Sequence, residues 1–217
     1  AWWVERMRCV FELVDVVRID HFRGFAGYWE IPASEPTAIH GQWRTGPGAD
    51  LFKAINAALG PMPIIAEDLG VITADVDALP REFSLPGMRV LQFGFDGSPE
   101  NPRLPHNYRH DTVAYTGTHD NDTTLGWYQS LPESAARHVD EYLAVDARHM
   151  PEAMVRAVIA SVARLAVVPV QDLLSLGRAA RFNTPGTVGG NWRWRLPDDA
   201  LQRLDPAPWR TMNHLYG

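Results

Sequence analysis

The chain has 217 residues, of which 46% are hydrophobic, and carries 26 acidic against 20 basic side chains. This mildly acidic balance lacks the basic footprint that nucleic-acid binding requires, so we expect no nucleic-acid partner. We also expect no membrane partner, because Arg156 and Arg164 interrupt the most apolar stretch before it reaches the roughly 20 residues of a membrane-spanning helix.

Short apolar runs alternate with helical patterns along the chain. The sequence opens inside a helical pattern, with Trp3, Met7 and Val10 at helix spacing. Strands are predicted over 13–19, 62–66, 88–95, 112–116 and 167–172, and helical segments include 51–59, 133–145 and 151–163. Strands that alternate with helices predict an α/β fold with a parallel sheet and right-handed crossovers.

Two segments do not fit this alternation. Residues 21–48 form a connection that is too long for an ordinary loop, and they include Trp29 and Trp43. Connections of that length in a compact domain are usually functional or disordered, and the aromatic side chains favour function. Residues 186–194 are rich in glycine and tryptophan and are predicted to form an irregular arm.

Three carboxylates stand where apolar runs end. Asp20, Glu67 and Asp120 each follow a short β-branched or apolar run and precede a polar turn that contains glycine. Buried parallel strands deliver side chains to the rim of a barrel in this way. Hydrolysis or transfer at a glycosidic bond needs one acid to protonate the leaving oxygen and one carboxylate to attack or stabilise the sugar cation. The three acids are therefore candidates for such a site.

Structural roles are the alternatives for these acids. Asp20 could simply pair with Arg18, two residues earlier on the same face of its strand, or with Arg23. Asp68 could cap a helix, with Glu67 merely beside it. The cluster around His119 and Asp120 invites a metal hypothesis, but its spacing lacks the glycine and distal glutamate of a calcium loop, and we expect neither a metal nor a cofactor.

At these positions the sequence resembles a known family. Its motifs are similar to the signature segments of amylomaltase, the family of 4-alpha-glucanotransferases or disproportionating enzymes that is related to the alpha-amylases. The resemblance rests on Arg18-Ile19-Asp20-His21-Phe22-Arg23-Gly24, Ala66-Glu67-Asp68-Leu69-Gly70, Leu104-Pro105-His106-Asn107-Tyr108, Gly117-Thr118-His119-Asp120-Asn121-Asp122-Thr123, Phe182-Asn183-Thr184-Pro185-Gly186-Thr187 and Gly190-Asn191-Trp192-Arg193-Trp194-Arg195. It therefore extends over essentially the whole chain.

The resemblance implies a (β/α)8 TIM barrel. A complete barrel usually needs about 250 residues and the family's chains are longer still, so we expect residues 1–217 to be a single partial barrel domain holding about strands four to eight. The missing N-terminal half of the same barrel would then be a partner, and we expect the fragment alone to be inactive. The one cysteine, Cys9, cannot form an internal disulfide, which suits a reducing compartment, and we expect a cytoplasmic location.

The resemblance also implies roles for residues. It makes Asp20 the nucleophile, Glu67 the general acid and base, and Asp120 the carboxylate that stabilises the transition state, with Asp122 as the alternative to Asp120. It implies substrate contacts from Arg18, His21, Asp68, Phe93, Asp96, His119 and Asn183, although Phe93 could equally belong to the core. Sugar rings stack on aromatic faces, so Trp29 and Trp43 are either glucan platforms or buried side chains. We expect Trp192 and Trp194 to pack the C-terminal arm.

The implied reaction is transfer of alpha-1,4-glucan segments from a donor maltooligosaccharide or starch to an acceptor sugar, by retaining double displacement. Two alternatives remain open. An alpha-amylase-like hydrolase would share all three acids but would release reducing sugar from maltotriose without transfer products. An inactive, truncated glucan-binding fragment would bind oligosaccharide without turnover.

Overall fold

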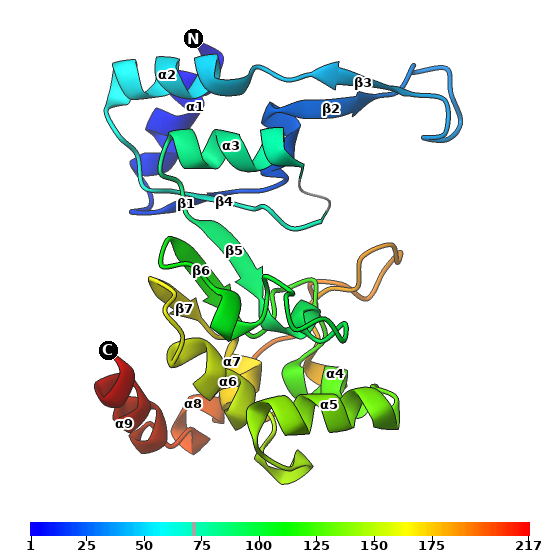
Figure 1. Ribbon diagram of the computed structural model, residues 1–217, viewed down its shortest axis with the longest axis vertical. Coiled ribbons are helices and arrows are strands. Elements are labelled where there is room, and N and C mark those ends of the chain that lie inside the picture. Colours follow the sequence, from blue (N-terminus) through cyan, green and yellow to red (C-terminus); the bar gives the residue numbers. More distant parts are fainter. Residues whose placement is uncertain (71–72) are drawn as a thin grey trace. The chain divides into compact units, whose positions relative to one another are not determined.

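The computed structural model of the chain describes residues 1–70 and 73–217 (Figure 1). They form two compact units, residues 1–88 and residues 89–217, each with its own hydrophobic core. The strand β5 (Gly87–Val90) contains the boundary. Within the described residues, no helix is both long enough and apolar enough to cross a lipid bilayer. Whether the units belong to a single barrel domain stays a prediction.

The first unit is built on one pair of parallel strands. Strand β1 pairs with β4 in the register Val17↔Ile64, Arg18↔Ile65 and Ile19↔Ala66. A two-stranded antiparallel ribbon and three α-helices complete the unit. Its elements are α1 (Trp2–Phe11), β1 (Val17–Ile19), the 3-10 helix η1 (Phe22–Phe25), β2 (Gly27–Glu30), β3 (Gln42–Thr45), α2 (Gly48–Leu59), β4 (Ile64–Ala66) and α3 (Ala74–Glu82).

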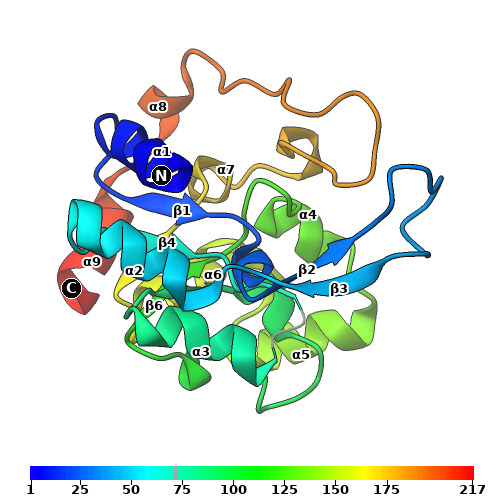
Figure 2. The same cartoon turned by 90° about the horizontal axis from the view of Figure 1, so that it is seen from above.

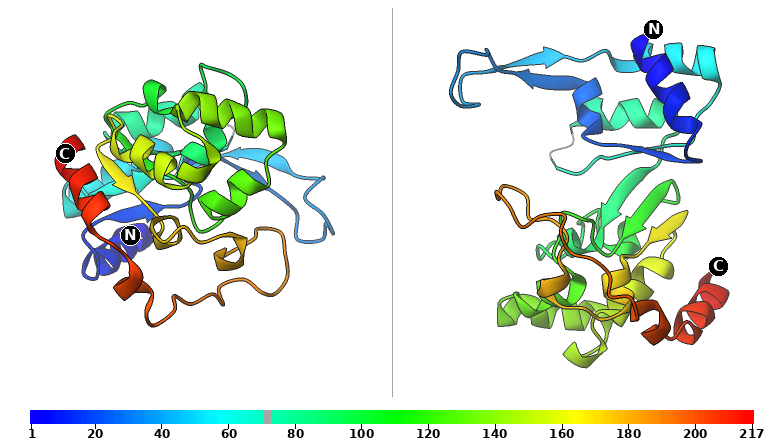
Figure 3. Two further views of the ribbon diagram at one scale, coloured as in Figure 1. Left: turned by 90° about the horizontal axis from the view of Figure 1, so that it is seen from below. Right: turned by 180° about the vertical axis from the view of Figure 1, so that it is seen from behind.

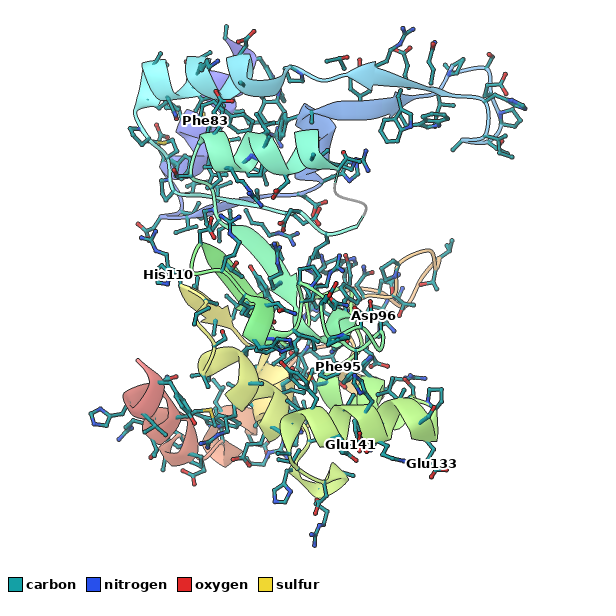
Figure 4. All side chains as sticks on the ribbon, viewed as in Figure 1. Phe83, Phe95, Asp96, His110, Glu133 and Glu141 are labelled. Atoms are coloured by element: carbon teal, nitrogen blue, oxygen red, sulfur yellow. The ribbon has the colours of Figure 1, made fainter. Side chains whose placement is uncertain are left out.

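Aromatic side chains fill the core of the first unit. Phe22 is 1% exposed and stacks on Phe52 of α2, with ring centroids 5.2 Å apart. Phe83, just after α3, packs against the same Phe52 ring at 5.4 Å (Figure 4). Because Phe22 follows Asp20 by two residues, burial of its ring anchors the chain where it leaves β1.

The connection over residues 21–48 is not an irregular loop. It contains the antiparallel pair β2 and β3, which extends as a ribbon away from α1, α2 and α3 (Figures 1 and 2). Trp29 and Trp43 are direct cross-strand partners with ring centroids 5.5 Å apart, and both remain exposed. Trp29 also donates to the Ala38 carbonyl at 2.8 Å, and its ring lies so close to Gly41 that any side chain there would clash. These tryptophans are therefore not core residues of the unit.

The second unit holds a three-stranded sheet in the order β5-β6-β7. Strands β6 and β7 are parallel, with Val113 opposite Leu165 and Tyr115 opposite Val167. The elements after β5 are η2 (Leu91–Gly94), η3 (Pro105–Asn107), β6 (Thr112–Tyr115), α4 (Thr124–Gln129), α5 (Glu133–Leu143), η4 (Ala147–His149), α6 (Glu152–Ile159), β7 (Leu165–Val167), α7 (Val170–Leu173), η5 (Arg178–Ala180), α8 (Ala200–Arg203) and α9 (Ala207–Tyr216).

Helix α6 provides the centre of the second core. Met154 and Val158 are at most 1% exposed and pack with Ala114 of β6 and Val139 of α5. Glu133 and Glu141 lie on the outer side of α5, which is thus amphipathic (Figure 4). Between η5 and α8 the chain runs without helix or strand, as predicted for the arm over 186–194 (orange in Figures 2 and 3).

Two predicted strands are wrong in part. The strand expected over 88–95 ends at Val90 and continues as the 3-10 helix η2. The strand expected over 167–172 instead spans Leu165–Val167, and α7 follows after Pro169. The run over 88–95 is largely buried, whereas Leu165 and Val167 of β7 are exposed, and a short apolar run does not by itself distinguish a strand from a helical turn. The first strand is also shorter than 13–19, because the apolar residues 13, 14 and 16 are exposed.

We predict that Val158→Ala lowers the free energy of unfolding by about 2 kcal/mol, because two buried methyl groups are removed and a cavity remains. Val162→Ala is the matched control, since the Val162 side chain is 58% exposed. It should change the free energy of unfolding by less than about 0.5 kcal/mol. Urea denaturation measures both, and equal losses would contradict the assignment of α6 to the core.

Candidate active site

The register of β1 and β4 brings two of the predicted acids to one edge. Asp20 follows Ile19 and Glu67 follows Ala66, and these two preceding residues are the last pair of the parallel ladder. The Glu67 amide donates to the Ile19 carbonyl at 2.9 Å, so the strands are still hydrogen-bonded where the acids begin. Both carboxylates therefore leave the sheet at the carboxyl end of adjacent parallel strands.

The Glu67 carboxylate shapes the turn that follows Asp20. Its two oxygens accept hydrogen bonds from the His21 amide at 2.8 Å and from the Leu69 amide at 2.6 Å. His21 has a left-handed backbone conformation, with φ of 47°. These bonds fix the turn after β1 to the turn after β4. Each carboxylate oxygen keeps a second lone pair, which is available to a proton or a sugar hydroxyl.

Among the described residues, Asp20 has one charged partner, Arg18, and its carboxylate is otherwise open. Arg18 Nη2 lies 3.0 Å from Asp20 Oδ1, which confirms the pairing expected from their position on one strand face. The Asp20 side chain is 76% exposed, whereas that of Arg18 is 29% exposed. Arg23, the other partner considered, places its guanidinium over the Trp43 ring at 4.7 Å. The Asp20 carboxylate is thus held from one side and accessible from the other.

Asp68 is tied to the strand that follows. Its Oδ1 accepts the Met88 amide at 2.7 Å, and a side chain at Gly87 would come within 2.4 Å of its carboxylate. Helix α3 begins at Ala74, with Thr73 at its N-cap position. The alternative in which Asp68 caps a helix is therefore wrong. Asp68 fixes the start of β5 beside Glu67.

In the second unit, Asp120 lies on the loop Gly117–Thr123 between β6 and α4. Its Oδ1 accepts a 2.6 Å hydrogen bond from Asn183 Nδ2, and His119 Nε2 lies 3.4 Å from the same oxygen. Arg181 donates to the Asp120 carbonyl at 2.8 Å. The structure thus brings together three predicted site residues, His119, Asp120 and Asn183, and half of the Asp120 side chain remains exposed.

Asp122 has a different environment from Asp120. Its side chain is 7% exposed, and Oδ2 accepts a 2.6 Å bond from Arg178 Nε. Its Oδ1 accepts the Thr123 amide at 2.9 Å, and its carbonyl accepts Gln92 Nε2 at 3.0 Å. Asp122 is therefore committed to holding the loop, which favours Asp120 as the carboxylate that can reach a ligand.

A cavity of about 410 Å³ lies beside this loop, entirely within the second unit. Its walls combine polar groups with aromatic rings from the arm. The ring of His119 lies 5.3 Å from that of Trp192, which contacts Phe182 in turn at 5.1 Å. The lining residues are Thr118, His119, Asn121, Asp122, Thr123, Pro169, Val170, Gln171, Asp172, Arg181, Phe182, Trp192 and Trp194. Aromatic and hydrogen-bonding groups in one cavity suit a sugar ring.

Phe93 and Asp96 follow β5 in the second unit. The Phe93 side chain is 47% exposed, so it is not a core residue, whereas Phe95 packs against Trp127 and Tyr142 (Figure 4). Asp96 accepts the Ser98 amide at 2.9 Å, and this bond, followed by one from Asn101, lowers the pKa of its carboxyl. Asp96 is exposed and ionised at neutral pH.

The described residues contain no group of three or more His, Cys, Asp or Glu arranged to hold a metal ion. Sequence reasoning missed Arg178, Arg181 and Asp172, which contact the loop or line the cavity. Their partners are about 50 to 60 residues away in sequence, and no local motif marks them. Only the position of Asp172 at the end of a predicted strand was a signal.

Comparison with known proteins identifies the family of the chain. A family model described as 4-alpha-glucanotransferase matches residues 1–202. The chain belongs to the 4-alpha-glucanotransferase family. It is 52% identical over 220 residues to the 4-alpha-glucanotransferase of Thermus thermophilus and 50% identical over 207 residues to the chloroplastic/amyloplastic enzyme of Solanum tuberosum. These alignments cover 98% and 94% of this chain but only 44% and 36% of the relatives, so the chain spans less than half of their length.

Two solved amylomaltase structures are similar to this chain. The amylomaltase from Streptococcus agalactiae in complex with acarbose matches 99% of the chain and 44% of its own length, with a TM-score of 0.92 and 37% identity. The amylomaltase from Corynebacterium glutamicum matches with a TM-score of 0.71 at 22% identity, covering 98% of this chain and 36% of its own, which supports the fold. The family expected from the motifs is confirmed.

The two acids of the His119–Asp122 segment should respond differently to amidation. Asp122→Asn places an amide against Arg178 in a buried position, and we expect a loss of about 1 to 3 kcal/mol in the free energy of unfolding. Asp120→Asn, the matched change at an exposed site, should cost less than about 0.5 kcal/mol. Chemical denaturation of both variants checks this. A larger loss for Asp120→Asn would assign the structural role to Asp120 instead.

Proposed function

We propose that this chain supplies the reacting carboxylates of a 4-alpha-glucanotransferase that acts on alpha-1,4-glucans and maltooligosaccharides. The observation that carries the proposal is the in-register pairing of β1 with β4, which delivers Asp20 and Glu67 to the same strand edge. Reaction at a glycosidic carbon uses a pair of carboxyl groups that flank the bond, and the retaining course is part of the proposal. Family membership supports the choice of transfer as the reaction.

In the proposed first step, an Asp20 oxygen attacks the anomeric carbon of the donor. The bond from that carbon to the glycosidic oxygen breaks, its electron pair stays on the departing oxygen, and Glu67 gives that oxygen its proton. The product is a β-linked glycosyl ester of Asp20. Arg18, 3.0 Å from Asp20, supports the attack by holding one carboxylate oxygen and so orienting the other toward the donor.

In the second step, the 4-hydroxyl of an acceptor sugar attacks the same carbon. Its proton passes to the Glu67 carboxylate, and the ester bond breaks to restore the Asp20 carboxylate. Two inversions leave the new linkage in the alpha configuration. Water competes with the acceptor, so transfer requires that sugar be bound tightly and water be excluded. The aromatic cavity beside His119 is a candidate for part of that sugar binding.

We further propose that the strands of this chain are about strands four to eight of a (β/α)8 barrel, and that Asp120 is the third acid. Asp120 is exposed whereas Asp122 is buried, and this supports Asp120 rather than Asp122 as the third acid. The proposed substrate contacts are Arg18, His21, Asp68, Phe93, Asp96, His119 and Asn183. The proteins named in the comparison are glucanotransferases and amylomaltases, and none supports the alpha-amylase alternative.

The experiment joins this chain to the part of the Thermus thermophilus relative that it does not match. The products that this chimaera forms from maltotriose are then measured. We expect glucose together with longer maltooligosaccharides, and we expect Asp20→Asn and Glu67→Gln each to lower the rate by about 10³-fold or more. The reason is that each variant removes a group that forms a bond to substrate or transfers the proton.

Asp15→Asn and Glu12→Gln are the matched controls, because both acids are exposed and lie before β1 rather than at its carboxyl end. They should retain the parent rate within about twofold. Near-normal transfer by Asp20→Asn or Glu67→Gln would refute the assignment. Reducing sugar without longer products would favour a hydrolase, and binding without turnover would favour a glucan-binding role.

A further inference from the structure

The second unit contains a buried carboxylate that the proposed reaction does not use. Asp172 lies in α7 and is 1% exposed. Its Oδ2 accepts hydrogen bonds from Thr116 Oγ1 at 2.6 Å and from Thr124 Oγ1 at 2.7 Å. Its Oδ1 accepts the Thr124 amide at 2.9 Å. Both threonine side chains belong to residues that are fully buried.

The two threonines are the two ends of one loop. Thr116 directly follows β6, and Thr124 is the first residue of α4, so the loop Gly117–Thr123 begins and ends on the same carboxylate. That loop contains His119 and Asp120. One side chain from a third element, α7, therefore closes the base of the loop that presents both proposed site residues.

Closing a loop with a buried carboxylate costs free energy, because the charged form is removed from water. Burial raises the pKa of Asp172, and the three hydrogen bonds offset this only in part. The folded state therefore binds a proton at Asp172 more tightly than the unfolded chain does. Ionisation thus costs folding free energy as the pH rises through that raised pKa. An amide of the same shape would avoid this cost and could form three hydrogen bonds in the same place, so the contacts of the side chain, not its charge, are what the loop requires.

Other side chains hold the middle of the loop. Arg178 pairs with Asp122, and Asn183 and Arg181 contact Asp120. These partners follow α7 within 11 residues along the chain. Asp172 thus connects the segment that contacts Asp120 to the end of β6 and to the start of α4, between which the loop lies.

We propose that Asp172 is a positioning residue, whose carboxylate clamps both ends of the loop Gly117–Thr123 and thereby fixes His119 and Asp120 toward the sugar. The proposal rests on the glucanotransferase function proposed above. Asp172 touches no reacting atom in this scheme. Its effect on turnover passes through the loop, which must hold its carboxylate within about 0.5 Å of the productive geometry.

The test compares three variants in the same chimaera with the Thermus thermophilus relative. Asp172→Ala removes the clamp, and we expect kcat for maltotriose to fall at least about tenfold with KM within about threefold, because misplacement by about 1 Å affects the transition state more than binding. Asp172→Asn can accept the Thr124 amide and donate to both hydroxyl oxygens. It should restore kcat to within about threefold of the parent, with a melting temperature equal or higher at neutral pH.

Asp140→Ala is the matched control. Asp140 accepts the Tyr128 hydroxyl at 2.7 Å in the same unit but on α5, and it has no contact with the loop among the hydrogen bonds of the described residues. We expect Asp140→Ala to lower the melting temperature and to leave kcat within about twofold. An equal fall in kcat for Asp140→Ala and Asp172→Ala would show that lost stability, not positioning, is responsible.

Hydrogen exchange separates this proposal from the proposed function. The amides of residues 117–124 should exchange at least about tenfold faster in Asp172→Ala than in the parent. Their exchange rate should be unchanged in Asp172→Asn and Asp140→Ala. If the parent chimaera does not transfer glucosyl units, the proposed function fails and the exchange result alone decides the clamp. Unchanged exchange over these residues in Asp172→Ala, or an unchanged kcat, would overturn the role of Asp172.

Discussion

The parallel pairing of β1 with β4 is the constraint on which the account of this protein depends. Only three residue pairs form the ladder, yet its last pair places Asp20 and Glu67 next to each other in the register. A slip of one residue in either strand would turn the side chains of that strand, and with them its acid, to the other face of the sheet. Burial of Ile19, Ile64 and Ala66 opposes such a shift, so the hydrophobic core of the first unit sets the position of the acids.

The acids of this chain divide into two kinds by their surroundings. Asp20 and Asp120 are exposed, and each has a cation or amide on one side that leaves the other side open. Asp122 and Asp172 are buried, and their oxygens accept hydrogen bonds from backbone amides and from the side chains of Arg178, Thr116 and Thr124. The buried Asp122 and Asp172 thus hold the loop that presents Asp120, and the hydrogen bonds that they accept offset part of the cost of burying them.

The sequence predicted those features of the structure that depend on residues close together in the chain. The end of β4, the start of β6, the partnership of Arg18 with Asp20, and the family all followed from short apolar runs and motifs. The turn to helix after Pro169 and the ribbon containing Trp29 did not follow, because a short apolar run does not distinguish a strand from a helix and because β2 and β3 pair across residues 31–41. Asp172 was missed for a similar reason, since its partners Thr116 and Thr124 are 56 and 48 residues away.

The most direct measurement is the identity of the carboxylate that becomes glycosylated. In the Glu67→Gln chimaera, an alpha-maltosyl fluoride donor loses fluoride without needing an acid, while the absent base slows transfer to the acceptor. Digestion and mass spectrometry of the trapped protein should then locate a maltosyl ester on Asp20. An ester on Asp68, Asp120 or another carboxylate would contradict the account of how β1 and β4 build the site.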